Sequence, residues 1–382
     1  MNSFYEFFSG GGMARAGLGA DWECLFANDI DEKKAASYAA NWGNDALCVR
    51  DVAELKVSVL PGQADLAWAS FPCQDLSAAG SRAGLSGDRS GTFWPFWHLV
   101  KELGNDGRPP RLIVLENVCG ALRSHDGKDF ATIGGAMAAA GYRFGALVIN
   151  ASHFLPQSRP RLFIVGAHKS FVKPATLSDK EPDERWHPPA LLEAHSKLSQ
   201  RARRAWVWWK LPEAPGRTSV LADVIEDEPQ GVRWDPAEKT QRLLRMMTPL
   251  NRAKVSDARK SGQRAVGTIY RRTRVEGQTG RKVQRAEIRF DDMAGCLRTP
   301  VGGSSRQTIM VIDGRRVRSR LLSPREAARL MGLPDDYILP TNYNEAYHLA
   351  GDGVAVDVVR FLAAHLLEPL AAERRPAKKQ AA

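Results

Sequence analysis

The chain has 382 residues, of which 43% are hydrophobic and 25% are charged. This length suits two domains with a substantial core, so the composition excludes a wholly disordered protein. Charges or prolines interrupt every apolar run before it reaches about 18 residues, and the N-terminus lacks a basic segment followed by an apolar one. We therefore expect neither a transmembrane helix nor a secretory signal.

The cysteines argue against a metal site. Five cysteines stand at positions 24, 48, 73, 119 and 296, and none forms a Cys-x-x-Cys pair. An odd number without metal-ligand spacing is unlike a zinc site or a disulfide framework, and it is typical of the reducing cytoplasm. We expect a cytoplasmic protein that binds no metal.

The formal net charge of +11 is concentrated in one segment. Residues 251–290 contain 12 Lys and Arg against three acids, a net charge of +9. Most basic runs are solvated faces, yet this share of the total charge is the footprint expected for a polyanion partner. We therefore expect this segment to bind nucleic acid.

The first 170 residues alternate short apolar runs with amphipathic stretches. This pattern predicts strands at 4–8, 22–27, 66–70, 112–115, 144–149 and 162–166. It predicts helices at 13–18, at 31–42 with Asp31 as the N-cap, at 93–103 and at 130–139. Such alternation indicates a parallel, doubly wound α/β sheet with its ligands at the carboxyl ends of the strands.

From about residue 170 to about residue 305 the periodicity fades, and Pro, Trp, Gly and Arg become dense. We expect a smaller, irregular second domain there. Ser323-Pro324-Arg325-Glu326 is a capping box with Pro at the first helical position, so a helix begins there and ends at Gly332. A last amphipathic helix is expected at 354–367. The tryptophans at 206–209 favour packing between the lobes over stacking on DNA.

A glycine-rich turn follows the first predicted strand. Phe8-Ser9-Gly10-Gly11-Gly12 lets the backbone approach a nucleotide-like ligand, although tight turns also collect glycines. Asp29, at the end of the second predicted strand, is placed to accept hydrogen bonds from ribose hydroxyls. Asp51 is either a third contact, near an adenine, or a surface acid.

Two later strands end in groups that can act together. Cys73 follows a strand directly, and polar residues come after it in place of a core pattern, with Pro72 stiffening the chain before it. Glu116 ends the next strand, where an acid could also cap the following element. A thiol and a carboxyl at one sheet edge make a nucleophile with a proton donor. Arg159 and Arg161 point to one side of a further strand, and cations beside a thiol lower its pKa.

In chain order, these segments resemble the motifs of the DNA cytosine-C5 methyltransferase family: the Phe-x-Gly-x-Gly loop, the acidic ribose contact, Pro-Cys-Gln, Glu-Asn-Val and Gln-x-Arg-x-Arg. The segment at 320–335 is similar to the family's penultimate motif, and Gly351-Asp352-Gly353-Val354 matches its last. The resemblance covers nearly the whole chain outside about 170–292, where the family has its target-recognition domain. Met13, Cys296 and Asp352 depart from the family's usual Gly, Thr and Asn.

The resemblance implies a Rossmann-like, S-adenosylmethionine-dependent methyltransferase fold with a smaller, irregular target-recognition domain. The expected catalytic and cofactor-binding domain spans 1–170 and 345–370, the DNA-binding domain 171–344, and a disordered basic tail 371–382. The implied activity is C5 methylation of a flipped-out cytosine in a specific sequence of double-stranded DNA, through a covalent bond from Cys73 to C6. An RNA cytosine-C5 methyltransferase is the alternative, but that branch of the family has a short variable region.

The resemblance also implies which residues form the site. Cys73 is the expected nucleophile, Glu116 binds N3 and the exocyclic amine, Arg161 binds O2, and Arg159 supports Arg161 and the thiolate. The expected contacts to S-adenosylmethionine come from Phe8, Gly10, Gly12, Asp29, Ile30, Asp51, Val52, Pro72, Phe93 and Asp352. The expected contacts to DNA come from Gln74, Ser77, Gln157, Arg271, Arg272, Arg274 and Arg298. We expect a monomer, associated with the nucleoid when bound to DNA, with a cognate restriction endonuclease as a further candidate partner.

Overall fold

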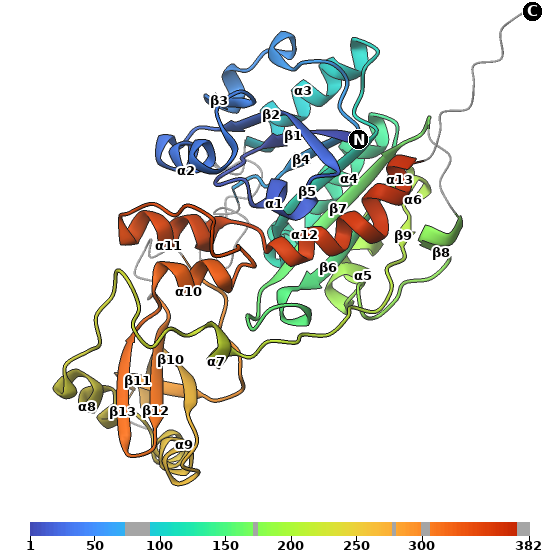
Figure 1. Ribbon diagram of the computed structural model, residues 1–382. Helices are drawn as coiled ribbons and strands as arrows, with labels where there is room; N and C mark the ends of the chain where they lie inside the picture. The colour runs from blue at the N-terminus through green and yellow to red at the C-terminus, as the bar shows by residue number, and fades with distance from the viewer. Residues whose placement is uncertain (73–91, 171–174, 277–279, 299–305, 373–382) are drawn as a thin grey trace, which may run out of the picture. The chain divides into compact units, whose positions relative to one another are not determined.

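The computed structural model describes residues 1–72, 92–170, 175–276, 280–298 and 306–372. The chain divides into two compact units (Figure 1). The first unit comprises Met1–Asn150, Pro160–Ala214 and Val354–Ala382, and the second comprises Ala151–Arg159 and Pro215–Gly353. The predicted nucleophile Cys73 and its neighbours Gln74 and Ser77 lie outside the described residues, as does the predicted tail from residue 373 onward.

The first unit is built on a seven-stranded sheet in the order β3-β2-β1-β4-β5-β7-β6. Its strands are β1 (Asn2–Phe7), β2 (Trp22–Asp29), β3 (Leu47–Val49), β4 (Leu66–Ala69), β5 (Leu112–Val118), β6 (Tyr142–Asn150) and β7 (Pro160–His168). The strands from β3 through β5 pair in parallel, whereas β7 is antiparallel to both of its neighbours. The predicted α/β fold is confirmed, and β7 is the exception to the parallel sheet that we expected.

In the first unit, the helices predicted at 13–18, 31–42, 93–103 and 130–139 begin and end close to those positions, whereas two helices at 189–205 were not predicted. The helices of this unit are α1 (Met13–Leu18), α2 (Glu32–Trp42), α3 (Phe93–Asn105), α4 (Lys128–Ala139), α5 (Pro189–Ser196), α6 (Gln200–Ala205), α12 (Val356–Leu362) and α13 (Glu368–Ala372). Asp31 caps α2 as predicted, because its carboxylate accepts hydrogen bonds from the backbone N–H groups of Lys33 and Lys34. In the described parts of the chain, no helix combines the length and the apolar character needed to cross a membrane.

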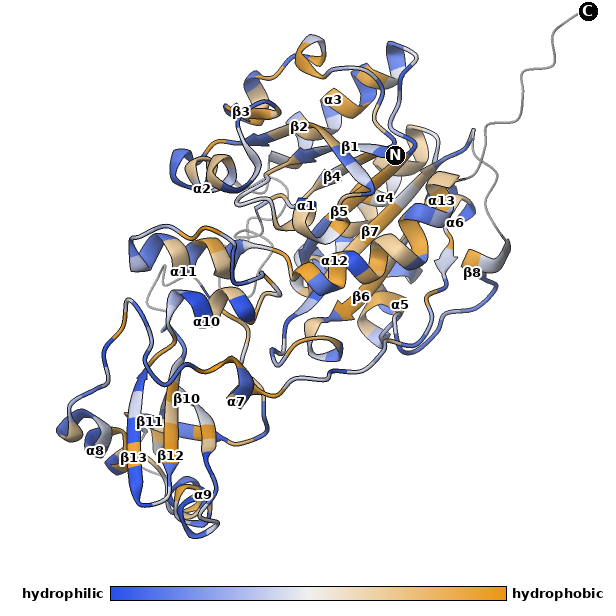
Figure 2. Cartoon of the chain, in the orientation of Figure 1, coloured by the Kyte–Doolittle hydropathy of each residue, from blue (hydrophilic) through white to orange (hydrophobic). Residues whose placement is uncertain are grey.

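One large hydrophobic cluster joins the sheet to α3 and α4. Tyr5 and Phe7 of β1 point into it because side chains alternate along a strand, and the ring of Phe96 in α3 lies 5.0 Å from that of Phe7. Figure 2 shows β5, β6 and β7 as hydrophobic over most of their length, as expected for strands covered on both faces. The α1 and α12 helices pack closely, and a Cβ on Gly17 would lie 2.4 Å from the Cβ of Val359.

The boundary after the first unit differs from the one expected at residue 171. Residues up to Ala214 belong to this unit because their tryptophans pack against its sheet. The backbone N–H of Val207 donates to the carbonyl of Phe144 (2.8 Å), and Nε1 of Trp209 donates to the carbonyl of Val165 (3.0 Å). The short strands β8 (Ser178–Asp179) and β9 (Trp208–Trp209) pair here. The tryptophan cluster thus packs against the sheet of the first unit.

The second unit contains a four-stranded antiparallel sheet in the order β11-β10-β12-β13. Its elements are α7 (Leu221–Val224), α8 (Ala237–Arg245), α9 (Pro249–Lys260), β10 (Ala265–Glu276), β11 (Arg281–Arg289), β12 (Thr308–Asp313), β13 (Arg316–Leu321), α10 (Pro324–Arg329) and α11 (Tyr343–Asp352). A small core joins Ile269, Ile288 and Met310 of the sheet to Leu243 of α8 and Val255 of α9. This regular sheet corrects the irregular domain that we expected.

A buried ion pair ties β13 to α10. The side chains of Arg320 and Glu326 are fully buried, and both terminal nitrogens of Arg320 contact the Glu326 carboxylate, at 2.7 and 2.6 Å. Glu326 also accepts a hydrogen bond from the backbone N–H of Ser323, and the Ser323 hydroxyl accepts one from that of Glu326, which confirms the capping box. Removal of either charge would leave the other buried and unpaired, at a high cost in stability.

Candidate active site

The loop between β1 and α1 has the backbone geometry that glycine permits. Positive φ angles occur at Phe8 (58°), Gly10 (54°) and Gly12 (76°). Such an angle is uncommon for a bulky residue such as Phe8 and is found most often at functional loops. The indole N–H of Trp42 in α2 donates to the carbonyl of Gly11 (3.1 Å) and so supports the loop from the side of that helix.

Asp29 holds the same loop from the end of β2. One oxygen of its buried carboxylate accepts a hydrogen bond from the backbone N–H of Gly10 (2.8 Å), and the other accepts one from Asp31 (2.9 Å). Burial raises the pKa of Asp29, while these two N–H groups act in the opposite direction. Each carboxylate oxygen can accept a second hydrogen bond. Asp29 therefore shapes the loop, and its contact to a ribose stays a prediction.

Two predicted cofactor contacts next to this loop differ in character. Ile30 follows Asp29 and is 64% exposed, which leaves an apolar side chain available to a flat ring. Asp51 caps the short 3-10 turn at Val52–Glu54 by accepting a hydrogen bond from the backbone N–H of Ala53 (2.9 Å). This local bond fits the surface-acid alternative for Asp51, and it leaves the second carboxylate oxygen for a ligand.

Other predicted cofactor contacts are covered by the protein itself. Val52 and Phe93 are buried members of the large cluster, and the ring of Phe93 lies 5.7 Å from those of both Phe71 and Trp97. Pro72 is partly buried at the end of its described segment. Asp352 is the exposed last residue of α11 in the second unit. The direct contact expected for Phe93 would require its ring to be uncovered.

Gly10 and Gly12 should respond differently to substitution. Gly12→Ala should unfold more easily, because its Cβ would lie 2.4 Å from Nε1 of Trp42 and its φ is positive. Gly10→Ala has the same backbone penalty but a Cβ with no protein atom within 4 Å, so it should retain more stability. Urea denaturation of both variants tests this difference. Equal losses of stability would contradict the role given to Trp42.

Glu6 is a buried acid behind the glycine loop. It alternates with Tyr5 and Phe7 along β1, and its Oε2 is buried without a hydrogen-bond partner among the described residues. Burial raises the pKa of Glu6 to about 8, with a further increase from the charge of Asp29. The backbone N–H groups of Ala14 and Arg15 in α1, and the Arg15 charge, act in the opposite direction. Glu6 is therefore protonated in the folded protein at neutral pH.

The stability of the fold should consequently depend on Glu6 and pH. The unfolded chain releases this proton near pH 4.5 and the folded chain near pH 8, so the free energy of unfolding should fall as pH rises between these values. Glu6→Gln stays neutral and should lose this slope, becoming more stable than the wild type at pH 8 and above. Urea denaturation from pH 5 to 9 measures both, and the exposed Glu23→Gln is the matched control. Parallel curves for Glu6→Gln and the wild type would contradict this assignment.

Glu116 and Arg161 meet on one face of the sheet. Arg161 of β7 lies opposite Val118 of β5, and Glu116 lies opposite Phe163, so the two side chains are diagonal neighbours. Nε of Arg161 is 3.2 Å from Oε1 of Glu116, and the side chains are only 15% and 9% exposed. The structure therefore brings together the predicted proton donor and the predicted cation.

Asn117 connects this pair to the chain that leads to Cys73. Its amide nitrogen donates to the carbonyl of Phe71 (3.2 Å), and its amide oxygen accepts from the backbone N–H of Val118 (2.9 Å). Phe71 lies two residues before Cys73, so the described end of that segment is fixed beside Glu116. Sequence reasoning gave Asn117 no role, although a buried amide next to an acid at a strand end was a signal.

Arg159 holds the backbone on both sides of Asp352. Its guanidinium is buried and donates to the carbonyls of Gly351 (2.8 Å) and Gly353 (2.7 Å) through Nη2, and to the carbonyl of Leu297 (3.3 Å) through Nη1. These contacts lie within the second unit. They give Arg159 a positioning role that the sequence did not indicate, and its predicted action on the thiolate stays a prediction.

Gln157 has a similar internal role. Its side chain is fully buried, its Nε2 donates to the carbonyl of Leu330 (2.6 Å), and its Oε1 accepts from the backbone N–H of Leu297 (3.2 Å). Both ends of its amide are bonded to the second unit itself, and the DNA contact expected for Gln157 stays a prediction.

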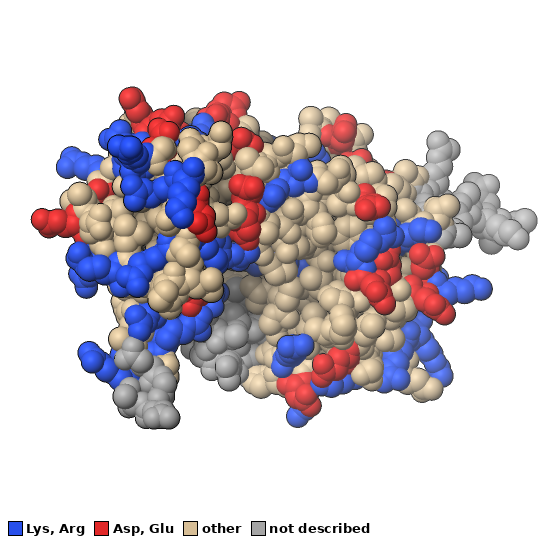
Figure 3. Space-filling view, turned by 90° about the horizontal axis from the view of Figure 1, so that it is seen from below, with Lys and Arg blue, Asp and Glu red and all other residues tan. Residues whose placement is uncertain are grey.

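The predicted DNA-binding arginines are exposed. Arg271, Arg272 and Arg274 lie on β10, and Arg298 lies in the chain that follows β11. Figure 3 shows many Lys and Arg side chains on the visible surface of the second unit. The exposure of these arginines agrees with the nucleic-acid-binding segment expected from the charge, while their contacts to DNA stay predictions.

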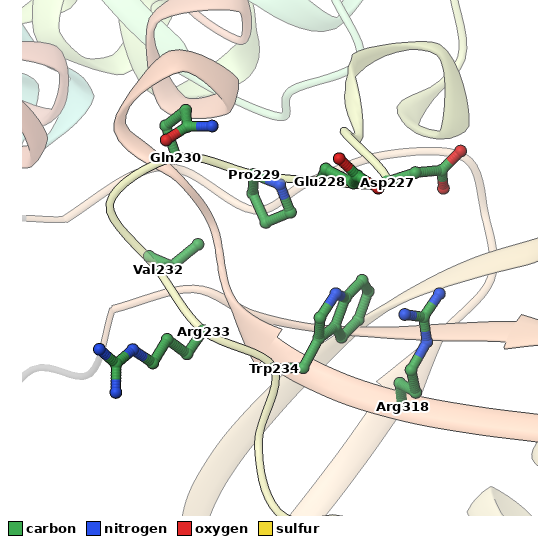
Figure 4. Close-up of a pocket in the computed structure, with 8 residues that line it drawn as sticks. All are labelled: Asp227, Glu228, Pro229, Gln230, Val232, Arg233, Trp234 and Arg318. Atoms are coloured by element: carbon green, nitrogen blue, oxygen red, sulfur yellow. The ribbon is translucent and has the colours of Figure 1, made fainter.

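The second unit also has a hollow of about 600 Å³. It is lined by Asp227, Glu228, Pro229, Gln230, Val232, Arg233, Trp234 and Arg318 (Figure 4). The guanidinium of Arg318 lies 3.9 Å from the ring centroid of Trp234, and that of Arg320 lies 4.7 Å away, at cation–π distances. Among the described residues, the lining includes none of the predicted catalytic or cofactor residues.

The sheet, the glycine loop and the strand-end carboxyl define a Rossmann-like methyltransferase. Residues 2–368 match the family model described as C-5 cytosine-specific DNA methylase, and the chain belongs to this family.

Several bacterial relatives align with almost the whole chain. The type II methyltransferase M.BsuFI of Bacillus subtilis is 25% identical, over 96% of this chain and 73% of its own length. M.NlaX of Neisseria lactamica is 25% identical, over 97% of this chain and 98% of its own length. M.HpaII of Haemophilus parainfluenzae is 26% identical, over 96% and 90% respectively.

Solved structures agree with the fold. The Dnmt2 methyltransferase of S. pombe matches with a TM-score of 0.57 and 17% identity, over 97% of this chain and 99% of its own. A putative DNA modification methyltransferase from an E. coli prophage matches with a TM-score of 0.55 and 16% identity, over 95% and 97%. At these identities the matches support the fold alone.

Proposed function

We propose that this protein transfers a methyl group from S-adenosylmethionine to C5 of a cytosine within a specific DNA sequence. The observation that carries the proposal is the contact between buried Glu116 and the mostly buried Arg161, which Asn117 fixes beside the segment that leads to Cys73. Membership of the C-5 cytosine-specific DNA methylase family gives this constellation its substrate. The relatives named above are type II methyltransferases, which supports DNA as the acceptor.

The glycine loop and its surroundings fit this cofactor. The backbone at Gly10 and Gly12 permits a close approach, Asp29 keeps acceptor capacity at the strand end, and Ile30 presents apolar surface. When bound, S-adenosylmethionine supplies an electrophilic methyl group on a sulfonium centre. The chain's own contribution is to hold that methyl group in line with the target carbon.

The protein must also activate the cytosine, because its C5 is a poor nucleophile. The Cys73 thiolate adds to C6, and the electron pair of the C5–C6 double bond becomes available at C5. Glu116 holds a proton at N3 and binds the exocyclic amine, while Arg161 fixes the Glu116 carboxyl and binds O2. After C5 takes the methyl group, loss of its proton and elimination of Cys73 restore the ring.

The target base lies inside a duplex, so it must leave the stack before this chemistry begins. Such base flipping costs about a few kcal/mol, which the protein recovers through contacts to the DNA. The exposed basic residues of the second unit supply phosphate contacts, and these carry most of the affinity.

Nucleoside analysis tests the proposal directly. Plasmid DNA and total RNA from a bacterial host that expresses the chain are digested and assayed for 5-methylcytosine, with a Cys73→Ala host as control. We expect 5-methylcytosine in the DNA of the wild-type host only, at one sequence in bisulfite reads. New 5-methylcytosine in RNA but not in DNA would establish the RNA alternative. Its absence from both would leave a binding protein on a methyltransferase fold.

A further inference from the structure

The β10–β11 hairpin extends beyond the core that it helps to form. Ile269 and Ile288 face each other inside the small core of the second unit, but the pairing continues to Glu276 opposite Arg281. Every β10 side chain from Arg271 to Val275 is exposed. A two-stranded ribbon exposed on both faces gains little from its own packing. It has dimensions that the major groove of B-DNA accepts.

The two faces of this ribbon carry different chemistry. Because side chains alternate, Tyr270, Arg272 and Arg274 share one face with Glu287 of β11, while Arg271 and its alternate neighbours point to the other. Glu287 lies directly opposite Tyr270, and the guanidinium of Arg272 lies 5.8 Å from the Tyr270 ring. The first face therefore has an acid among arginines that are otherwise available to DNA.

Glu287 holds Arg274 by one edge of its guanidinium. Nε and Nη2 of Arg274 both donate to Oε1 of Glu287, at 2.8 and 2.5 Å, while Oε2 lies 3.5 Å from Nε of Arg272. This side-on contact uses the Nε edge and leaves the Nη1–Nη2 edge with its N–H groups pointing away from Glu287. The Arg274 side chain is 50% exposed and that of Glu287 29%.

An arginine fixed in this way is oriented to bind guanine. Two parallel N–H groups of a guanidinium match the O6 and N7 acceptors of guanine in the major groove. The same fork can bind a phosphate, but a side chain that is already fixed loses less freedom when it binds a base edge. On the basis of the proposed function, we propose that Arg274 reads a guanine of the target sequence and that Glu287 is its positioning residue.

The sequence preference of the enzyme is the decisive readout. Plasmid and chromosomal DNA are recovered from hosts expressing the wild type or Arg274→Lys, and bisulfite sequencing gives the methylated sequence of each. Lysine keeps the charge but lacks the planar fork that Glu287 can hold by one edge. We expect Arg274→Lys to lose preference for guanine at one position by about tenfold or more, as for one bidentate pair. Arg143→Lys, at an exposed arginine on β6 of the first unit, should keep the wild-type preference at every position.

Glu287 is tested through Arg274. Glu287→Ala should weaken preference at the same position, and in the Arg274→Lys background it should add no further loss, because the two residues act as one unit. Thermal melting of each purified variant checks that the fold is retained. A uniform loss of methylation at all sequences, with the preference unchanged, would make Arg274 a phosphate contact and overturn the inference. A wild-type chain that leaves no 5-methylcytosine in DNA would instead contradict the proposed function itself.

Discussion

Cys73→Ala should abolish methyl transfer while leaving DNA binding largely intact. In the proposed mechanism the thiolate makes C5 nucleophilic, and alanine has no group that could form the covalent bond to C6. Affinity for DNA depends mainly on phosphate contacts, which the substitution does not alter. Methyl transfer to a duplex bearing the methylated sequence and a filter-binding measurement on the same duplex separate the two effects.

A duplex with 5-fluorocytosine at the target position makes the assignment sharper. Fluorine at C5 cannot leave as the proton does, so the enzyme stays bound to C6 after methyl transfer. The wild type should form a complex that survives denaturing electrophoresis, and Cys73→Ala should form none. Cys119→Ala is the matched control, because Cys119 directly follows β5 and lies near the same charged pair. Burial raises the pKa of Cys119, the charge of Arg161 lowers it, and the charge of Glu116 raises it. A trapped complex with Cys73→Ala, or the absence of a trapped complex with Cys119→Ala alone, would refute the assignment of Cys73 as the nucleophile.

Sequence patterns predicted the part of the protein in which local signals and sheet topology agree. Apolar runs placed the central strands, and Glu116 follows from the rule that strand ends meet at one sheet edge. Its pairing with Arg161 was less direct, since β7 is antiparallel and the contact depends on register. The motif order nevertheless predicted a role for both residues.

The missed features depend on contacts between distant parts of the chain. Gln157 and Arg159 bind carbonyl and amide groups of residues at least 138 positions away, so no local pattern could show that they are internal. The β10–β11 hairpin escaped prediction for another reason. Its outer half is polar on both faces, and a strand without an apolar face lacks the alternation that reveals strands in a sequence.

Glu287 acts on the basic segment through its contacts as well as through its charge. Counted in sequence, it is one of three acids that merely reduce the basic excess of residues 251–290. In the structure it is bonded to Arg274 and close to Arg272, so it determines how those arginines are presented. Net charge predicts a nucleic-acid surface, whereas the selection of a base depends on which cations are held in place.

Glu116→Gln should lower the rate of methyl transfer by about 100-fold or more, the scale expected when a general acid is removed. The amide fills the same space but cannot hold a proton at N3, and it replaces the ion pair with Arg161 by a neutral contact. Binding of S-adenosylmethionine should change little, because the glycine loop and Asp29 do not depend on Glu116. Single-turnover rates and calorimetric titration of the cofactor measure the two quantities on one preparation.

The 5-fluorocytosine duplex distinguishes this residue from the nucleophile. Glu116→Gln retains Cys73, so it should still form the denaturation-resistant complex, only more slowly and to the same final extent. Arg161→Lys keeps a cation near Glu116 without the planar fork of the guanidinium. Its rate of complex formation should lie between those of the wild type and Glu116→Gln. A normal rate for Glu116→Gln would show that another group protonates the base. Complete failure to trap would mean that Glu116 is needed for addition of Cys73 itself, and not for its acceleration alone.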